Sequence, residues 1–421
     1  MTPTIASLES DSQAGLAENL DRLAEVAVRV GLNLARGQEL VMTAPLEALA
    51  LARRITEQAY KAGASLVTTL FVDDEATLLR FRYASDTMFD RAPEWFYNGL
   101  AAAYASGTAR LAITGSNPAL LANEEPAKVA RANVAMSKAS RPALELIARH
   151  EINWTIVPSA TPAWAKLVFP NESEQDAMSH LWDGIFAATR ANASDPVAAW
   201  KKHTTALERR VDILNGKRYS ALHFRGPGTD LRVGLADDHL WLGGATMSRN
   251  GIRCIPNMPT EEVFTTPHKD RVDGVVRSTK PLSYQGALIE NIEVRFERGS
   301  VVEARSTQGE QVLRGMLDTD EGARKLGEVA LVPHSSPVAA SGILYWNTLF
   351  DENAASHIAL GQAYSTCMRN SDSLSTEERF ARGANESLIH VDWMIGSGEV
   401  DVDGINADRS SEPVMRRGEW V

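Results

Sequence analysis

The chain has 421 residues, of which 44% are hydrophobic and 23% are charged. A chain of this length is typical of about two to three domains, and its composition is that of a globular protein. Its only cysteines, Cys254 and Cys367, are too few for a disulfide framework or for a zinc site made of thiolates. The net charge of −11, without clusters of Lys and Arg among aromatic residues, argues against nucleic acid as a partner.

No stretch of the sequence approaches the roughly 20 consecutive apolar residues of a membrane helix. The opening residues, MTPTIASLESDSQAGLAENL, also lack the basic start and the apolar stretch of a secretory signal. We therefore expect a cytoplasmic protein that has no membrane partner.

In the first half of the chain, helical patterns alternate with short apolar strand patterns. The expected helices cover residues 20–34, 46–62, 93–105 and 126–150, and the expected strands cover residues 39–42, 65–72, 110–114 and 153–158. Such alternation requires crossover connections, which favour a mostly parallel sheet covered by helices on both faces. We predict an α/β domain over residues 1–210. It contains no glycine-rich phosphate loop, so a nucleotide role has no support.

The second half has a different sequence pattern, in which expected strands are separated by Gly and Asp. Strands are expected at residues 219–224, 230–235, 239–242, 290–296 and 301–305, the last two joined as a hairpin through Glu297-Arg298-Gly299. We predict a mixed α+β domain over residues 211–421, with an antiparallel-rich sheet and helices.

Two segments of this second domain place a carboxylate beside strongly patterned sequence. NMPTEEVFTTP has prolines at both ends, which favour an extended path, so Glu261 and Glu262 point to opposite faces and only one can enter a given pocket. In GEVALVP, Glu328 opens an apolar run, where a buried carboxylate has to be paired or bound to metal. A solvated acidic turn and an exposed strand end are the simpler alternatives.

Two further segments supply imidazoles. In FDENAASHIALGQAY, residues 354–360 are good helix material, and His357 and Tyr364 share a face if the helix continues through Gly361. In LIHVDWMIG, a predicted strand, His390 and Asp392 project to the same face because they are two residues apart. Each histidine alone is equally compatible with an ordinary hydrogen-bonded residue.

Taken together, the segments offer three carboxylates and two imidazoles, a set suited to zinc, cobalt or manganese. Five donors exceed one tetrahedral site. Two divalent ions, three carboxylates and one bridging hydroxide give a nearly neutral cluster, which favours a hydrolytic two-metal centre. This charge count does not distinguish between amides, peptides and phosphoesters as substrates.

The same four segments resemble those of the thermophilic aminopeptidase family, of the leucyl aminopeptidase T and aminopeptidase S type, and the similarity extends along nearly the whole chain. The resemblance implies metal ligands at Glu262, Glu328, His357, His390 and Asp392, and an active-site tyrosine at Tyr364. It also implies a homodimeric exopeptidase of broad specificity that acts on short peptides.

For such an enzyme we expect a metal-bound hydroxide to attack the first peptide carbonyl. Glu328, or else Glu262, would carry the proton to the leaving nitrogen, and Tyr364 would stabilise the intermediate or bind a metal. One alternative is a ring-cleaving dioxygenase of the same fold, with iron(II) held by His357, His390 and Asp392. A second alternative is a peptide-binding protein without catalysis.

Overall fold

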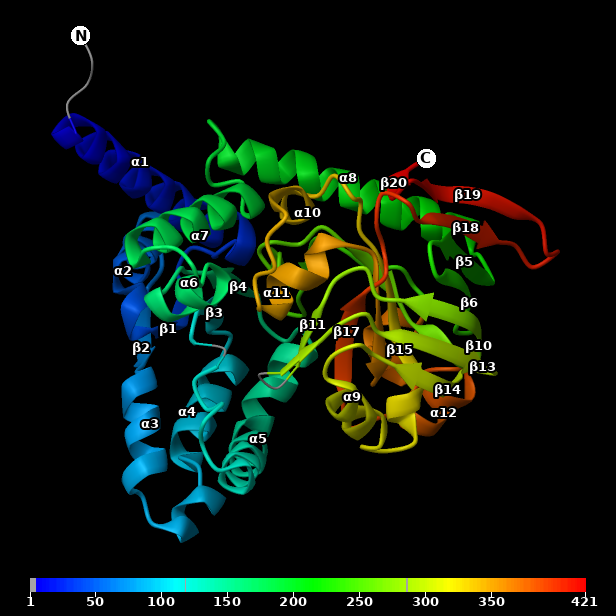
Figure 1. The fold of residues 1–421 in the computed structure, drawn as a ribbon. Helices are drawn as coiled ribbons and strands as arrows, with labels where there is room; N and C mark the ends of the chain where they lie inside the picture. Colours follow the sequence, from blue (N-terminus) through cyan, green and yellow to red (C-terminus); the bar gives the residue numbers. More distant parts are fainter. Residues whose placement is uncertain (1–4, 118, 285–286) are drawn as a thin grey trace. The chain divides into compact units, whose positions relative to one another are not determined.

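The computed structural model describes residues 5–117, 119–284 and 287–421 (Figure 1). These residues form two compact units, which are considered separately. The first contains the chain up to His203 together with Ala245–Pro259, and the second contains Thr204–Gly244 and Thr260–Val421. The predicted boundary at residue 210 falls within helix α8 (Pro196–Lys217), which spans the change of unit.

The first unit is built on a four-stranded parallel sheet of order β2-β1-β3-β4. Its strands are β1 (Glu39–Pro45), β2 (Leu66–Val72), β3 (Ala109–Thr114) and β4 (Trp154–Pro158), and a small pair β7 (Thr246–Met247) and β8 (Arg253–Cys254) stands apart. Its helices are α1 (Ile5–Val26), α2 (Leu49–Ala62), α3 (Asp74–Tyr83), α4 (Glu94–Ala105), α5 (Pro126–Ala148), α6 (Pro162–Val168) and α7 (Glu174–Ala188), with short turns η1 (Ala27–Leu32), η2 (Leu46–Ala48) and η3 (Asp86–Asp90). The predicted α/β fold with a parallel sheet is confirmed.

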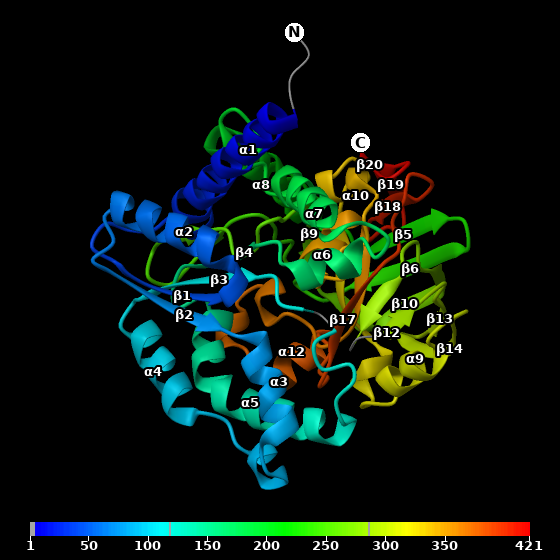
Figure 2. The same cartoon turned by 60° about the vertical axis from the view of Figure 1, so that its left-hand side comes forward.

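Helices cover both faces of this sheet. Tyr104 of α4 and Ile147 of α5 pack with Val41 of β1 in one buried cluster. Figures 1 and 2 show α1 and α2 on the opposite side of the sheet from α4 and α5. Burial on both faces explains the apolar run of β1, whereas the edge strand β2 is largely exposed. Within the described residues, no helix is both long enough and apolar enough to cross a membrane.

The second unit contains an eight-stranded antiparallel sheet of order β14-β13-β10-β6-β5-β18-β19-β20. Its strands are β5 (Ala221–Gly226), β6 (Thr229–Leu235), β10 (Pro267–Arg277), β13 (Glu293–Glu297), β14 (Ser300–Arg305), β18 (Asp401–Ile405), β19 (Ser411–Arg416) and β20 (Glu419–Trp420). The predicted hairpin is present as β13 and β14. Its turn places Arg298 and Gly299 at φ 48° and 84°, and a Cβ on Gly299 would lie 1.8 Å from the Lys269 carbonyl oxygen, so glycine is required there.

A second antiparallel sheet, of order β17-β16-β15-β9, carries the candidate site. It consists of β9 (Val263–Thr265), β15 (Leu326–Leu331), β16 (His357–Gly361) and β17 (His390–Met394). The remaining elements of the unit are the pair β11 (Leu282–Tyr284) and β12 (Ala287–Ile289), helices α9 (Glu310–Leu317), α10 (Pro337–Ser341), α11 (Thr348–Asp351) and α12 (Thr376–Ala381), and turns η4 (Gly322–Arg324), η5 (Glu352–Ala354), η6 (Ser365–Cys367) and η7 (Ser371–Ser373).

The two sheets of the second unit share one hydrophobic core. Val329, Ile358 and Trp393 lie opposite one another on β15, β16 and β17, and all three are buried in this core with Phe224 of β5 and Leu231 of β6. Because side chains alternate along a strand, their neighbours on the same three strands point to the other face of the β9–β17 sheet. That other face is where the predicted ligands lie.

Candidate metal centre

One face of the β9–β17 sheet, which we call the donor face, is lined by Glu328, Ala330, His357, Ala359, His390 and Asp392. Glu328 and Asp392 both lie opposite Ala359 of the central strand, and His390 lies opposite Gly361. The central strand therefore carries one imidazole followed by two positions with little or no side chain. The large donors on either side project over this floor of small residues, which leaves room between them.

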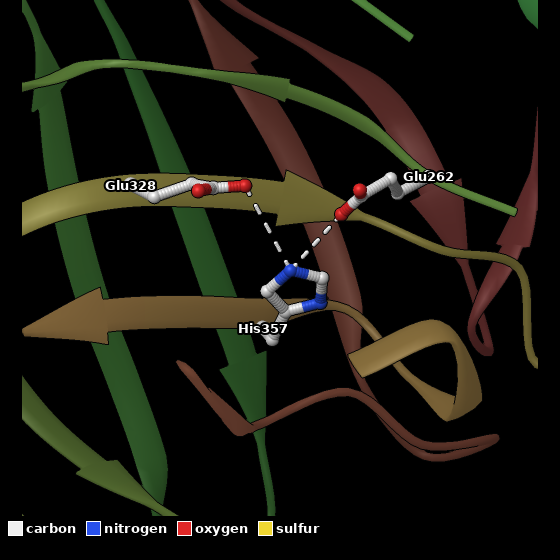
Figure 3. A group of neighbouring side chains, drawn as sticks. All are labelled: Glu262, Glu328 and His357. Carbon is white, nitrogen blue, oxygen red and sulfur yellow. Dashed lines mark ion pairs between the residues drawn. The ribbon is translucent and has the colours of Figure 1, made fainter. Parts of the chain in front are cut away.

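The donors form two groups that share Glu328. In the first, His357 Nε2 lies 3.1 Å from Glu262 Oε2 and 3.9 Å from Glu328 Oε1, and both carboxylates point toward the imidazole ring (Figure 3). In the second, His390 Nε2 lies 3.3 Å from Glu328 Oε2 and 3.4 Å from Asp392 Oδ1. The ligand atoms within each group lie within 4.8 Å of one another, so each group has the geometry to hold a metal ion.

Strand β9, which follows Glu261 and Glu262, determines which of the two carboxylates lies on the donor face. Phe264 lies opposite Ala330, so Phe264 and Glu262, two residues before it, belong on the donor face. Glu261 shares the alternate side with Val263, which is buried in the shared core. The Glu261 amide donates a 2.6 Å hydrogen bond to Asn353 Oδ1, which fixes the backbone at this point.

Both imidazoles are oriented by backbone carbonyls. Nδ1 of His357 lies 3.1 Å from the Ala355 oxygen, and Nδ1 of His390 lies 2.7 Å from the Gln362 oxygen. Each Nδ1–H therefore donates to the backbone, and Nε2 is the nitrogen directed at the carboxylates. Metal-binding histidines are commonly oriented in this way, because the hydrogen bond from Nδ1–H fixes the tautomer in which Nε2 is free to coordinate.

Tyr364 follows β16 and lies at the edge of the donor face. Its ring centroid is 4.6 Å from that of His390 and 5.9 Å from that of Phe264, and 46% of the residue is exposed. Burial of the hydroxyl and the nearby Glu328 and Asp392 carboxylates raise the pKa of Tyr364 well above its usual value. The hydroxyl is therefore protonated at neutral pH and is available as a hydrogen-bond donor.

The electrostatics of the group are those of a site that attracts cations. Burial raises the pKa of Glu328 to about 7, and Asp392 and Glu262 add to the effect. Burial lowers the pKa of His357, but Glu262 and the other carboxylates outweigh it and raise the pKa to about 10. In the same way, Asp392 and Glu328 outweigh burial and raise the pKa of His390 to about 11. A bound cation would take the place of these protons.

The donor set fits divalent ions on chemical grounds. Glu262 Oε2, His390 Nε2 and Asp392 Oδ1 are buried and have no partner with good hydrogen-bond geometry in the described part of the chain. Buried polar atoms without partners are rare and require an explanation such as an ion. Oxygen and imidazole ligands suit zinc, cobalt and manganese.

One expectation about this region is wrong. The helix predicted over residues 354–360 is absent, and His357–Gly361 forms the central strand β16. Pairing with β15 on one side and β17 on the other overrides the helical propensity of the alanines. Tyr364 consequently does not share a helical face with His357. The chain leaves the strand at Gly361, whose φ of 105° and close approach to the Ile389 carbonyl favour glycine.

The sequence analysis also did not select Glu352, which lies close enough to the donors for its pKa to respond to Glu262 and Asp392. Its segment had been singled out for His357 and Tyr364. The acidic pair Asp351-Glu352, which stands in a run of small and apolar residues, is the sequence signal that could have identified Glu352.

Comparison with known proteins now bears on this geometry. A family model described as thermophilic metalloprotease (M29) matches residues 16–420. The chain belongs to the thermophilic metalloprotease (M29) family. Its M29 relatives include aminopeptidase T of Thermus thermophilus, 55% identical over 404 residues that are 96% of this chain and 98% of that protein. Aminopeptidase 2 of Geobacillus stearothermophilus is 45% identical over 404 residues, with the same shares of 96% and 98%.

A solved structure described as wild-type AmpT from Thermus thermophilus superimposes on this M29 chain with a TM-score of 0.91. The two sequences are 53% identical, and the match covers 96% of this chain and 99% of that one. The predicted membership of the thermophilic metallo-aminopeptidase family is therefore confirmed, as is the use of divalent metal.

Proposed function

We propose that the chain is a broad-specificity aminopeptidase with two divalent ions held by Glu262, Glu328, His357, His390 and Asp392. The observation that carries the proposal is the convergence of two donor groups, joined through Glu328, on one face of one sheet. Membership of a metalloprotease family and relatives named aminopeptidases support hydrolysis of peptides from the N-terminus.

Each residue has a role that follows from its surroundings. Ions bound there would supply a nucleophilic hydroxide at neutral pH and polarise the scissile carbonyl. Glu328, which belongs to both donor groups, is the first choice for carrying the proton to the leaving nitrogen, and Glu262 is the second. The protonated Tyr364 hydroxyl would donate a hydrogen bond to the oxyanion.

The remaining parts of the proposal concern the setting of the enzyme. Short peptides are the proposed substrates, zinc, cobalt or manganese the proposed ions, and the cytoplasm the proposed location. A homodimer is supported by Leu66, Phe71 and Val72, large apolar residues exposed on the edge strand β2. Apolar side chains gathered on an unpaired strand edge are typical of a contact surface.

The decisive experiment removes metal and then adds back zinc, cobalt, manganese or iron(II) singly, with aminoacyl anilides and short peptides as substrates. Glu262→Gln and Glu261→Gln form a matched pair, because each changes one charge at adjacent positions. We expect Glu262→Gln to abolish turnover and to lower the number of bound ions, whereas Glu261→Gln retains most of both. Equal losses in the two variants would overturn the ligand assignment.

The two alternatives predict different results in the same experiment. A dioxygenase would bind one iron per chain and consume oxygen, but the two glutamates argue against it because an iron triad needs open coordination positions. A non-catalytic peptide-binding protein would bind peptides under saturating zinc or cobalt without releasing an amino acid. The complete donor set argues against this second alternative.

A further inference from the structure

A small cavity lies along the edge strand β17, next to the candidate metal centre. Its volume is about 60 Å³, and Asp392 and Met394 of the donor face form one of its walls. Glu352, the first residue of η5, lines the same cavity, and η5 packs against β17. Trp346 and Leu282 supply apolar surface on the remaining sides. Glu352 and Asp392 thus line the same small cavity.

Glu352 is not one of the five proposed ligands, and it has no partner of its own. Its carboxylate makes no hydrogen bond or ion pair with any residue that the structure describes. Asp392 Oδ1, which belongs to the same wall, is likewise buried without a hydrogen bond there.

The adjacent Asp351 shows what a purely structural carboxylate in this segment looks like. Its two oxygens accept hydrogen bonds of 2.8 Å from the Tyr345 amide and 3.0 Å from the Asn347 amide. Asp351 therefore stabilises the turn that precedes α11. Glu352 makes no such bond to the described residues, and it lines the cavity instead.

The charge of the whole site indicates which kind of ligand would bind Glu352. Two divalent ions, three ligand carboxylates and one hydroxide sum to zero, so an ionised Glu352 adds one negative charge that these groups do not balance. A small monocation with several N–H donors would balance it. The cavity has room for a few non-hydrogen atoms and no more, which suits an ammonium group on its carbon.

We propose that Glu352 binds the protonated N-terminal amine of the peptide, in the cavity that it shares with Asp392. The inference rests on the proposed aminopeptidase function and deepens it. It assigns recognition of the free N-terminus to a side chain that is not a metal ligand. A peptide whose terminus is acylated loses both the positive charge and the donors, and it leaves Glu352 unpaired. Glu352 thereby accounts for exopeptidase specificity.

The test compares Glu352→Gln, which keeps the shape and removes the charge, with Glu377→Gln on the exposed helix α12 as the control. Binding of 3-methylbutylamine, a primary amine that cannot be hydrolysed, is measured by NMR on the zinc-loaded proteins, and 3-methylbutanol is the uncharged reference probe. Bound zinc is counted by mass spectrometry. KM and kcat are measured with leucine anilide. Glu352→Asp, which shortens the side chain but keeps its charge, reports on folding.

We expect Glu352→Gln to retain its zinc and to weaken amine binding and raise KM about 10- to 100-fold, with little change in kcat. Binding of 3-methylbutanol stays unchanged, Glu352→Asp recovers part of the amine binding, and Glu377→Gln behaves as the wild type. A loss of kcat with unaltered KM and amine binding would overturn the inference in favour of proton transfer. Loss of zinc would overturn it in favour of a ligand role. If the wild type hydrolyses nothing, the proposed function fails, while amine binding is still measured independently.

Discussion

Asn353 is the residue through which the position of Glu262 can be tested without touching a ligand. Its side chain is completely buried. Oδ1 accepts the 2.6 Å bond from the Glu261 amide, and Nδ2 donates a 2.9 Å bond to the Leu349 carbonyl. The amide side chain therefore connects the start of β9 to α11, and the Asn353→Ala change removes both bonds.

The loss of stability in Asn353→Ala follows from the two backbone groups that it leaves without a partner. The Glu261 amide, which is buried, and the Leu349 carbonyl, which is partly buried, each lose a partner at about 1–3 kcal/mol apiece, so we expect the second unit to lose about 2–6 kcal/mol of stability. The loosened backbone also carries Glu262. Removing a group that orients a metal ligand typically costs about 10- to 100-fold in metal affinity, and we expect a loss of that size.

Hydrogen exchange measured by mass spectrometry over residues 257–266, together with calorimetric titration of zinc, gives both quantities. Asn153→Ala is the matched control, because Asn153 is also fully buried and donates a 2.9 Å bond to the Leu32 carbonyl, but in the first unit. It should lose stability without losing zinc affinity. The reasoning is refuted if exchange near Glu261 stays unchanged in Asn353→Ala, or if both variants bind zinc equally well.

Three other predictions follow from the donor face and its surroundings. Ala359→Val introduces a better strand former but fills the space between Glu328 and Asp392. Zinc affinity should therefore fall about 10-fold or more while the thermal midpoint drops only modestly. A zinc titration identical to that of the wild type would contradict this. Chelation should lower the thermal midpoint, because ions at 100 times their Kd stabilise the folded state by about 2.7 kcal/mol; a midpoint independent of added zinc speaks against a folded-state site. Burial raises the pKa of Asp351 to about 6, so the folded state holds its proton while the unfolded state ionises near pH 4. Stability should therefore decrease, on the order of 2–3 kcal/mol, as pH rises from about 4 to about 6, and urea unfolding of Asp351→Asn should lack this contribution; parallel curves for the two proteins would exclude it.

The features that could be predicted from the sequence are those encoded by near neighbours. His390 and Asp392 lie two residues apart on a strand, so their shared face follows from local geometry. The extended path through Glu262 follows from its flanking prolines. Four strands of the first unit were identified because their apolar runs are bounded by polar turns.

The errors and omissions arise where distant parts of the chain decide the outcome. His357 sits in an alanine-rich segment whose local preference is helical, and only pairing with β15 and β17 makes it a strand. The cavity that Glu352 lines is completed by Leu282 and Asp392, which lie far away in sequence. Helix α7 was missed despite a readable signal, since Ser173 accepts a bond from the Asp176 amide in the manner of a helix cap.

The order of the β9–β17 sheet, in which each donor-bearing strand pairs with the next one in the chain, has a consequence for folding fidelity. A slip of one residue between β16 and either neighbour would turn a whole strand over and send its imidazole or carboxylates into the hydrophobic core. Such a molecule would lack the full set of donors. A pair of ions held by all five donors would therefore be captured only by chains with the correct strand register, and its binding would withdraw those chains from the folding equilibrium. In the cell, the supply of metal would then act as a proofreading step on the protein itself.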